Sequence, residues 1–326
     1  MKHNICLLSL LMVVLMFVAC GKEEPAAPEL TQTEQPAVLA KQGDPAVLAK
    51  MNQINAQLAA MGSNLFLNEI EFFTIGEGRP SNRILQQPFR WVPNDPRRNA
   101  DGDNITYLVD KSDGKTASGL KNSDTEPAID RALATWDDEI TCEGGDNVDI
   151  IKRADRGQDP DIFDSFFGFG GFGNPFLADI VNAGWLPLAY FDAVVEGGPG
   201  SGCGVLAFSV TFIFLDGNGN PSDINGDNYL DTALNEVYYN DDFGDPTSPC
   251  QAGIPNDTQP WGIDQALPGI DVETVALHEN GHSFGIGHFG PPPDAVMNPR
   301  YAGMRQDLLN TDEAAYCINY SSWPNP

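Results

Sequence analysis

An eleven-residue stretch with the sequence HENGHSFGIGH separates its three histidines by four and then six residues. On an α-helix, residues four apart lie about 40° apart around the axis and one turn along it, so His278 and His282 point the same way. Glu279 is carried on the same turn. Gly285 can adopt the left-handed conformation that ends helices, which lets the chain return and bring His288 toward the other two rings. The spacing therefore predicts three imidazoles that converge beside a carboxylate.

Three imidazole nitrogens with a fourth position left for water are how proteins hold catalytic zinc, whereas structural zinc is usually closed by four protein ligands. The competing interpretation is that these are core or surface histidines of an amphipathic helix, because a bare HExxH recurs by chance. The longer motif is more specific. The chain has four histidines in all, and His3 lies in a segment that we expect to be removed. We therefore expect one Zn²⁺ bound by His278, His282 and His288, with Glu279 able to reach a water molecule on it.

These residues, together with VMNPRY at 296–301, resemble the metzincin zinc peptidases and, among them, the matrixin-like branch. The resemblance implies that the three histidines bind zinc, that Glu279 is the general base, and that Met297 forms the methionine turn beneath the metal. It also implies that Pro299 and Tyr301 form a wall of the S1′ substrate pocket. Because residue 299 is a proline, the tyrosine switch ligand of astacin-like and serralysin-like relatives is not expected.

The same resemblance implies that residues 88–326 form an α+β catalytic domain. Its expected parts are a twisted mixed sheet with an edge strand for substrate, an active-site helix, the methionine turn and a C-terminal helix. The segment Gly184–Phe191, GWLPLAYF, resembles the edge strand that matrixins pair with an extended substrate. The segment LNTDE at 309–313 resembles the start of the terminal helix, which packs beneath the site.

Residues 104–109 resemble the first strand of matrixin domains. Local patterns assign further elements of this domain. Residues 148–151 are expected to be a strand, and Val205–Leu215 is a β-branched and aromatic run typical of a central strand. Between the first two strands, apolar residues recur at helical spacing after Asp124, which we expect to cap that helix.

The N-terminus is typical of a targeting segment. Its apolar run, residues 5–19, is short for a membrane span. The sequence FVACG resembles a bacterial lipobox, with residues 1–19 as the signal peptide and Cys20 as the lipid-modified residue. A plain secretory signal with an incidental cysteine is the alternative. Either reading predicts an exported protein, and the lipobox predicts a lipid anchor in the bacterial outer membrane, facing the periplasm or the cell surface.

The segment between the signal and the catalytic domain has two expected parts. Residues 20–44 are rich in Pro, Ala, Glu and Gln, which is typical of a disordered tether. Residues 45–87 begin with an expected helix and continue with FLNEIEFFTIG, which is either a strand or a small pro-segment. No cysteine lies between Cys20 and Cys142, so the cysteine-based latency device of matrixins is not expected.

Charge and cysteine content limit the partners and the redox state. Eighteen basic and forty-six acidic residues give a net charge of −28, which excludes the clustered basic surface of a nucleic-acid-binding protein. We expect a monomer that acts on proteins or peptides. Excluding Cys6 and Cys20 leaves four cysteines, namely Cys142, Cys203, Cys250 and Cys317. An even number in such a chain predicts two disulfides, with three pairings open, and favours them over a second zinc site.

An acidic loop at residues 216–231 is a candidate for structural calcium. Four of its side chains fall at ligand positions of an EF-hand-like loop. They are Asp223, Asn225, Asp227 and Asp231. Asn228 stands where glycine is wanted and Leu234 where the bidentate glutamate should be, so a true EF-hand is not expected. Calcium binding and a plain acidic turn both remain open.

Taken together, these patterns predict a zinc-dependent endopeptidase. The alternative is a catalytically inactive metzincin scaffold, displayed as a surface lipoprotein for adhesion or binding. The presence of Glu279 favours the enzyme, because a scaffold that merely holds zinc has no need of that carboxylate.

Overall fold

The structure is a computed structural model. It describes residues 44–75, 87–98, 102–112, 115–143, 148–170, 176–250 and 256–324. These residues all fall within one unit, Pro36–Pro326. The expected signal peptide at residues 1–19, the lipidated Cys20 and nearly all of the expected tether at residues 20–44 lie outside the described residues.

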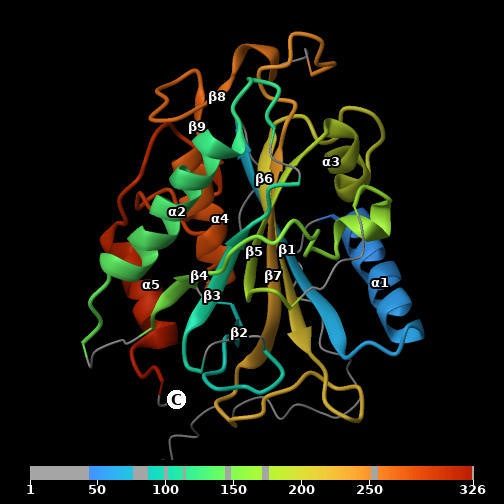
Figure 1. The fold of residues 1–326 in the computed structure, drawn as a ribbon, viewed down its shortest axis with the longest axis vertical. Coiled ribbons are helices and arrows are strands. Elements are labelled where there is room, and N and C mark those ends of the chain that lie inside the picture. The colour runs from blue at the N-terminus through green and yellow to red at the C-terminus, as the bar shows by residue number, and fades with distance from the viewer. Residues whose placement is uncertain are drawn as a thin grey trace, which may run out of the picture. The chain divides into compact units, whose positions relative to one another are not determined.

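One mixed sheet forms the centre of the described chain, with the strand order β10-β1-β6-β7-β5-β3-β4 and with β2 paired to β7 (Figure 1). Its strands are β1 (Leu65–Ile75), β2 (Phe89–Arg90), β3 (Ile105–Val109), β4 (Ile150–Lys152), β5 (Ile180–Leu186), β6 (Val205–Phe214), β7 (Leu230–Asn240) and β10 (Arg300–Tyr301). Strand β6 runs antiparallel to both neighbours, β1 and β7. The remaining pairs are parallel, including β1 with β10.

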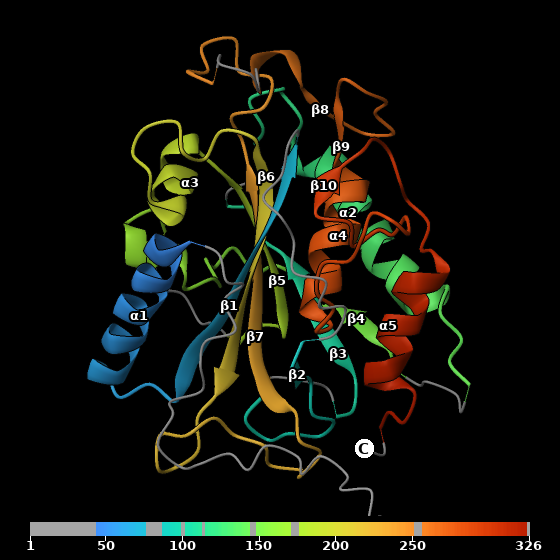
Figure 2. The same ribbon diagram turned by 180° about the vertical axis from the view of Figure 1, so that it is seen from behind.

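Helices cover both faces of this sheet (Figures 1 and 2). They are α1 (Pro45–Ala60), α2 (Asn122–Asp138), α3 (Leu188–Val195), α4 (Val272–Ser283) and α5 (Asn310–Tyr320). Helices α2, α4 and α5 lie on one face, and α1 and α3 lie on the other. Two 3-10 turns, Asp164–Phe167 and Asn256–Thr258, and a small two-stranded sheet of β8 (Trp261–Gly262) and β9 (Ile270–Asp271) complete the described elements.

Each face of the sheet has its own apolar core. Under α2, α4 and α5, the Trp136 ring packs against Phe284 and Tyr316, and its indole N–H donates to the Leu277 carbonyl oxygen at 2.9 Å. On the other face, Met51 of α1 and Tyr190 of α3 pack into a second cluster. Burying a side chain of this size contributes about 1.5–3 kcal/mol, so α1 is held to the sheet by its apolar face.

The N-terminal helix and strand belong to this architecture. Asp44 caps α1 by accepting from the Ala46 N–H at 3.0 Å, and Gly62 ends the turn after it with φ of +71°. The expected helix is confirmed. Leu65–Ile75 then forms β1, an eleven-residue strand inserted between β6 and β10. The segment is therefore a strand, and an inhibitory role for it as a pro-segment stays a prediction.

The prediction that residues 184–191 form the substrate-binding edge strand is wrong. Gly184–Phe191 does not form an edge, because β5 lies inside the sheet between β3 and β7. The chain leaves β5 at Pro187, the N-cap of α3, and Leu188–Val195 is helical. The continuous apolar run reflects a strand buried on both faces followed by a buried helix, rather than a half-exposed edge.

The other local predictions agree more closely with the structure. The strands expected at 104–109, 148–151 and 205–215 correspond to β3, β4 and β6. The helix expected after Asp124 is α2, but Asp124 is not its cap. The helix begins at Asn122, and the Asp124 carboxylate accepts from the Lys121 backbone N–H at 3.0 Å as the third residue of a capping box.

Two disulfides are present, as expected. Cys142–Cys317 ties the end of α2 to α5, and Cys203–Cys250 ties the turn before β6 to the loop after β7. Within the part of the chain that the structure describes, no helix combines the length and the apolar character needed to span a bilayer.

Candidate metal centre

Helix α4 carries the first half of the histidine motif and is buried along its whole length. It starts at the cap Asp271, whose carboxylate accepts from the Thr274 N–H at 2.9 Å. It ends at Ser283, and Gly285 follows with φ of +72°. A Cβ on Gly285 would lie 2.5 Å from the Phe89 carbonyl oxygen, so both the turn and the packing require glycine there. The predicted left-handed turn is confirmed.

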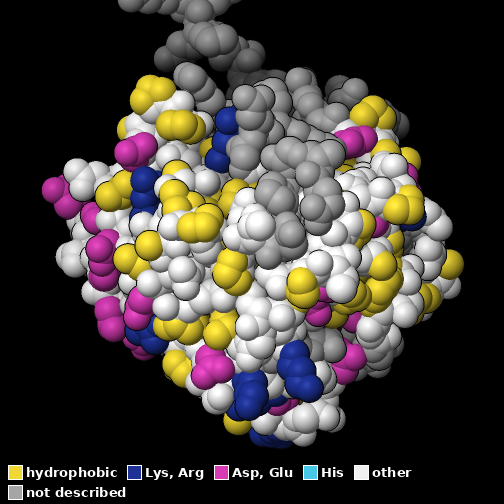
Figure 3. Space-filling model, turned by 90° about the horizontal axis from the view of Figure 1, so that it is seen from above, with side chains coloured by type: hydrophobic (Ala, Val, Ile, Leu, Met, Phe, Trp, Pro, Cys, Tyr) yellow, Lys and Arg dark blue, Asp and Glu magenta, His cyan; other side chains and the backbone are white. Residues whose placement is uncertain are grey.

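The three histidines converge through one nitrogen each. His288 Nε2 lies 3.0 Å from His278 Nε2 and 3.2 Å from His282 Nε2. All three rings are buried, and no histidine side chain is visible on the face drawn in Figure 3. Three nitrogens held tetrahedrally at the usual zinc distance would lie about 3.3 Å apart. The spacing of the nitrogens therefore fits one zinc ion.

The opposite ring nitrogens fix the tautomers. His278 Nδ1 lies 2.7 Å from the Val296 carbonyl oxygen, and His282 Nδ1 lies 2.7 Å from the Ile286 carbonyl oxygen. A carbonyl oxygen accepts only, so each Nδ1 carries the hydrogen and each Nε2 presents a lone pair. Lone pairs facing each other at this distance repel in a buried site unless a cation lies between them. The donor set thus suits a metal ion.

The third ring is held by a residue that the sequence analysis did not single out. Glu71 Oε2 of β1 lies 3.2 Å from His288 Nδ1, and both side chains are buried. The Gln87 amide donates to the other Glu71 oxygen at 3.4 Å. A carboxylate behind a ligand histidine orients the ring and raises its basicity. The available signal was the pair of acidic residues, Glu69 and Glu71, inside the otherwise apolar run FLNEIEFFTI.

Glu279 is the predicted general base, and that role stays a prediction. It follows His278 on α4 and is fully buried. Burial raises the pKa of Tyr239, and the charge of Glu279 raises it further. Asn280 faces the sheet instead, where its amide donates to the Asn182 side-chain oxygen at 3.2 Å.

Met297 packs against α4, and its role as a methionine turn stays a prediction. A Cβ on Gly281 would lie 2.3 Å from Met297 Sδ and 2.9 Å from Trp136 Cζ2, so the sulfur packs directly against the helix backbone. The Asp312 carboxylate of α5 accepts from the backbone N–H groups of Val296 and Met297 at 2.8 and 3.1 Å. Burial raises the pKa of Asp312, and these hydrogen bonds oppose the rise. The terminal helix thus anchors the turn.

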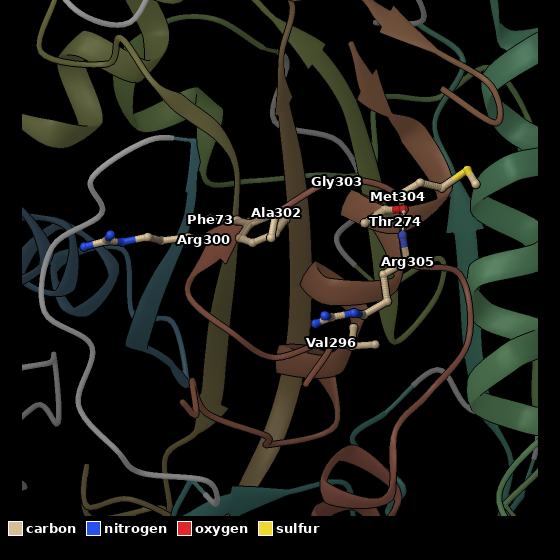
Figure 4. Close-up of a pocket in the computed structure, with 8 residues that line it drawn as sticks. All are labelled: Phe73, Thr274, Val296, Arg300, Ala302, Gly303, Met304 and Arg305. Atoms are coloured by element: carbon tan, nitrogen blue, oxygen red, sulfur yellow. Dashed lines mark hydrogen bonds between the residues drawn. The ribbon is translucent and has the colours of Figure 1, made fainter. Parts of the chain in front are cut away.

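A pocket of about 50 Å³ opens beside the centre (Figure 4). It is lined by Phe73, Thr274, Val296, Arg300, Ala302, Gly303, Met304 and Arg305. Figure 4 shows Phe73 beside Ala302, with the Arg300 side chain extending away from the others. The predicted wall residues lie next to this lining. The Tyr301 hydroxyl accepts from the Asp271 N–H at 2.9 Å, and the Pro299 carbonyl oxygen accepts from the Thr74 hydroxyl at 3.4 Å. Their role in a substrate pocket stays a prediction.

The four predicted calcium ligands lie in the loop between β6 and β7, where arginines engage two of them. Asp227 pairs with Arg90 at 2.6 Å, and Asp231 pairs with Arg97 at 2.5 Å. Asp223 accepts from the Asp227 and Asn228 backbone N–H groups, and the Asn225 amide donates to Asp227. The structure thus ties these side chains to arginines and to the loop backbone, and calcium binding here stays a prediction.

A separate acidic group lies at the end of β3. One ligand atom from each of Asp110, Asp159 and Asp161 falls within 4.8 Å of the others. The Tyr238 hydroxyl donates to Asp161 at 3.1 Å, and burial raises the pKa of Asp161 to about 12. Burial thus favours the protonated form of this carboxyl.

The family model described as Matrixin matches residues 245–319. These residues contain α4, the three histidines, Met297 and α5. No curated protein matches the chain. The match and the histidine group support a matrixin-like or metzincin-like family, and the mixed α/β architecture fits a metzincin-like domain. Strand β1 and its Glu71 lie outside the matched residues.

Proposed function

We propose that this chain is a zinc-dependent endopeptidase, a metalloprotease that hydrolyses peptide bonds within proteins. The observation that supports this proposal best is the convergence of three buried imidazole Nε2 atoms at 3.0–3.2 Å. Their Nδ1 atoms are all committed to oxygen partners. That arrangement supplies three neutral ligands, and a water molecule as the fourth would complete the donor set of catalytic zinc.

The roles of the protein's own residues follow from their positions. When bound, zinc supplies Lewis acidity, which polarises a carbonyl group and lowers the pKa of a water molecule to about 7. Glu279 accepts the proton of the attacking water and passes it to the leaving amine. Its fully buried position excludes bulk water and strengthens its interaction with a nearby positive charge.

The experiment that tests this proposal measures casein hydrolysis by the purified chain and by the variants Glu279→Ala and His282→Ala. Each protein is assayed with and without a chelator. We expect hydrolysis by the intact sequence after activation, a loss of about 10²–10⁴-fold in Glu279→Ala and loss of hydrolysis in His282→Ala. We also expect one zinc per chain in Glu279→Ala but not in His282→Ala. Equal hydrolysis by the chain and by Glu279→Ala would eliminate the mechanism. Zinc content reports on the metal site independently of activity.

A binding role is the second candidate. The observation that favours it is the complete burial of His278, Glu279 and Asn280, because a closed site turns over no substrate. A metzincin scaffold used for adhesion as a surface lipoprotein would bind zinc and its partner yet show no hydrolysis in any form of the chain. Casein hydrolysis measured after removal of β1 distinguishes the peptidase from the binding protein.

Three further parts of the proposal concern location and ions. We propose export and a lipid anchor at Cys20, facing the periplasm or the cell surface. Cys20→Ser should release the protein from membranes, and protease treatment of intact cells should tell the two sides apart.

We also propose a monomer that acts on protein or peptide substrates. Structural calcium in the loop with Asp223 is testable by calcium-dependent thermal stability, which Asp223→Asn should reduce.

A further inference from the structure

Strand β1 lies in the position that an extended peptide would take beside the metal centre. Extended peptides bind proteins by adding a strand to an exposed sheet edge. Without β1, that edge would be β6, whose backbone groups would be unpaired. In the structure, β1 pairs antiparallel with β6 from Leu65 opposite Phe214 to Thr74 opposite Val205 (Figure 2). The edge closest to the site is already occupied.

A second strand holds β1 on its other side. Strand β10 follows the methionine turn and runs parallel to β1, with Thr74 opposite Arg300 and Ile75 opposite Tyr301. Beyond the pairing with β6, the Ile75 N–H donates to the Gly204 carbonyl oxygen at 2.8 Å. The end of β1 is therefore clamped between two strands at the pocket beside the metal centre.

The side chains of β1 reach the metal ligands directly. Glu71 contacts His288, and the Phe73 ring stacks on the His278 ring with centroids 3.8 Å apart and planes 10° apart. Phe73 also lines the adjacent pocket. Because side chains alternate along a strand, Glu71 and Phe73 face α4 while Ile70 and Phe72 face the second core. The strand thus covers two of the three ligands.

We infer that Leu65–Ile75 is an internal pseudo-substrate, which occupies the substrate groove and keeps the intact chain inactive. This inference rests on the proposed function. The groove accordingly accepts an extended polypeptide segment, with an aromatic or large apolar side chain placed as Phe73 is. Activity requires that the segment leave the groove between β6 and β10.

The pseudo-substrate is anchored by the helix that precedes it. The Asn55 side chain of α1 donates to the Leu67 carbonyl oxygen at 3.0 Å and accepts from the Leu67 N–H at 2.7 Å. Lys50 pairs with Glu196 of the α3 C-cap at 2.9 Å. These contacts make the segment a strong competitor of external substrates. Because it is covalently joined to the domain that forms the groove, it loses little entropy when it binds.

The direct experiment releases the segment. A site for a sequence-specific protease is inserted between Ile75 and Gln87, and a matched control carries the same site before Asp44. Removal of the N-terminal piece also removes Glu71, so the assay contains saturating zinc. Cleavage at the first site and removal of that piece should then raise casein hydrolysis about tenfold or more, the change expected if the groove is mostly occupied in the intact chain. Cleavage of the control should change nothing. A synthetic peptide of residues 65–75 should inhibit the released form.

A pair of point variants tests the same inference in the intact chain, in case the released form does not fold. Ile70→Ala weakens β1, whereas Ile150→Ala makes the same deletion in β4 at the far edge of the sheet. Their side chains are similarly buried, 6% and 8% exposed. Ile70→Ala should raise basal hydrolysis several-fold, and Ile150→Ala should not. Equal rates in both variants and in the unaltered chain would overturn the inference.

Failure of the inference and failure of the proposed function give different results. Binding of a fluorescent 65–75 peptide is measured in the Glu279→Ala background, so that hydrolysis does not interfere. The released Glu279→Ala variant could bind the peptide while the released chain with Glu279 intact hydrolyses nothing. That result would support the pseudo-substrate and refute the peptidase. If the intact and released chains hydrolyse casein at equal rates, the result would support the peptidase and refute the pseudo-substrate. Neither binding nor hydrolysis would refute both.

Discussion

The Glu71 carboxylate lies 3.2 Å from Nδ1 of His288, although the two residues are separated by most of the chain. His288 belongs to the segment matched by the family model and Glu71 does not. The N-terminal strand therefore contributes the acceptor that fixes one ligand ring, in the way that backbone carbonyl oxygens fix the other two. In the intact chain, the metal centre is completed by β1.

The first prediction concerns this acceptor. In the intact chain, Glu71→Ala should weaken zinc binding about 10–100-fold, because an unsupported ligand ring loses both orientation and basicity. Glu71→Gln should have a smaller effect, since its amide oxygen can still accept from Nδ1. Zinc affinity is measured by competition with a chromophoric chelator. Identical affinities in all three proteins would show that Glu71 does not support the ligand.

The comparison between the sequence and the structure explains why Glu71 was missed. The spacing of His278, His282 and Gly285 encodes a helix and a turn, so local geometry alone predicted the convergence. The partner of His288 depends on β1 entering the sheet between β6 and β10, a pairing between distant segments that no local pattern specifies. The disulfide pairing was open for the same reason.

The edge-strand prediction failed through a related ambiguity. The run GWLPLAYF is apolar throughout, and such a run fits a strand buried on both faces as well as a substrate-binding edge. Pro187 marked the point where the strand ends and α3 begins. Strand β6 was correctly predicted to be a central strand. The sequence did not show that β1 would pair with it.

The second prediction concerns Gly281, inside the histidine motif. Gly281→Ala should lower the free energy of unfolding by about 1–3 kcal/mol, because the added Cβ would overlap Met297 Sδ and crowd Trp136. Urea unfolding measures the change. If the overlap is the cause, combining it with Met297→Ala should cost less than the sum of the two single changes. Strict additivity would indicate a different cause.

The third prediction concerns the anchor of the methionine turn. Asp312→Asn places an amide group where the carboxylate now accepts from Val296, Met297 and Leu309 N–H groups. A lost acceptor in a buried site costs about 1–3 kcal/mol, so unfolding should occur at lower urea concentration. Glu313→Gln is the matched control, since it removes one charge from the same helix turn. A similar loss in both variants would point to helix-dipole effects rather than to the turn.

The last prediction is a pH dependence of stability. Burial, reinforced by the neighbouring charges of Asp242 and Asp245, raises the pKa of Asp241 to about 6. A carboxyl whose pKa is higher in the folded state stabilises the fold below its unfolded pKa of about 4, and this contribution is lost as the pH rises through about 6. Asp241→Asn cannot ionise, so its unfolding free energy should fall less than that of the unaltered chain between pH 4 and 7. Asp245→Asn, which removes one repelling charge, should give an intermediate slope in urea unfolding. Parallel curves for the unaltered chain and Asp241→Asn would show that Asp241 titrates alike in both states.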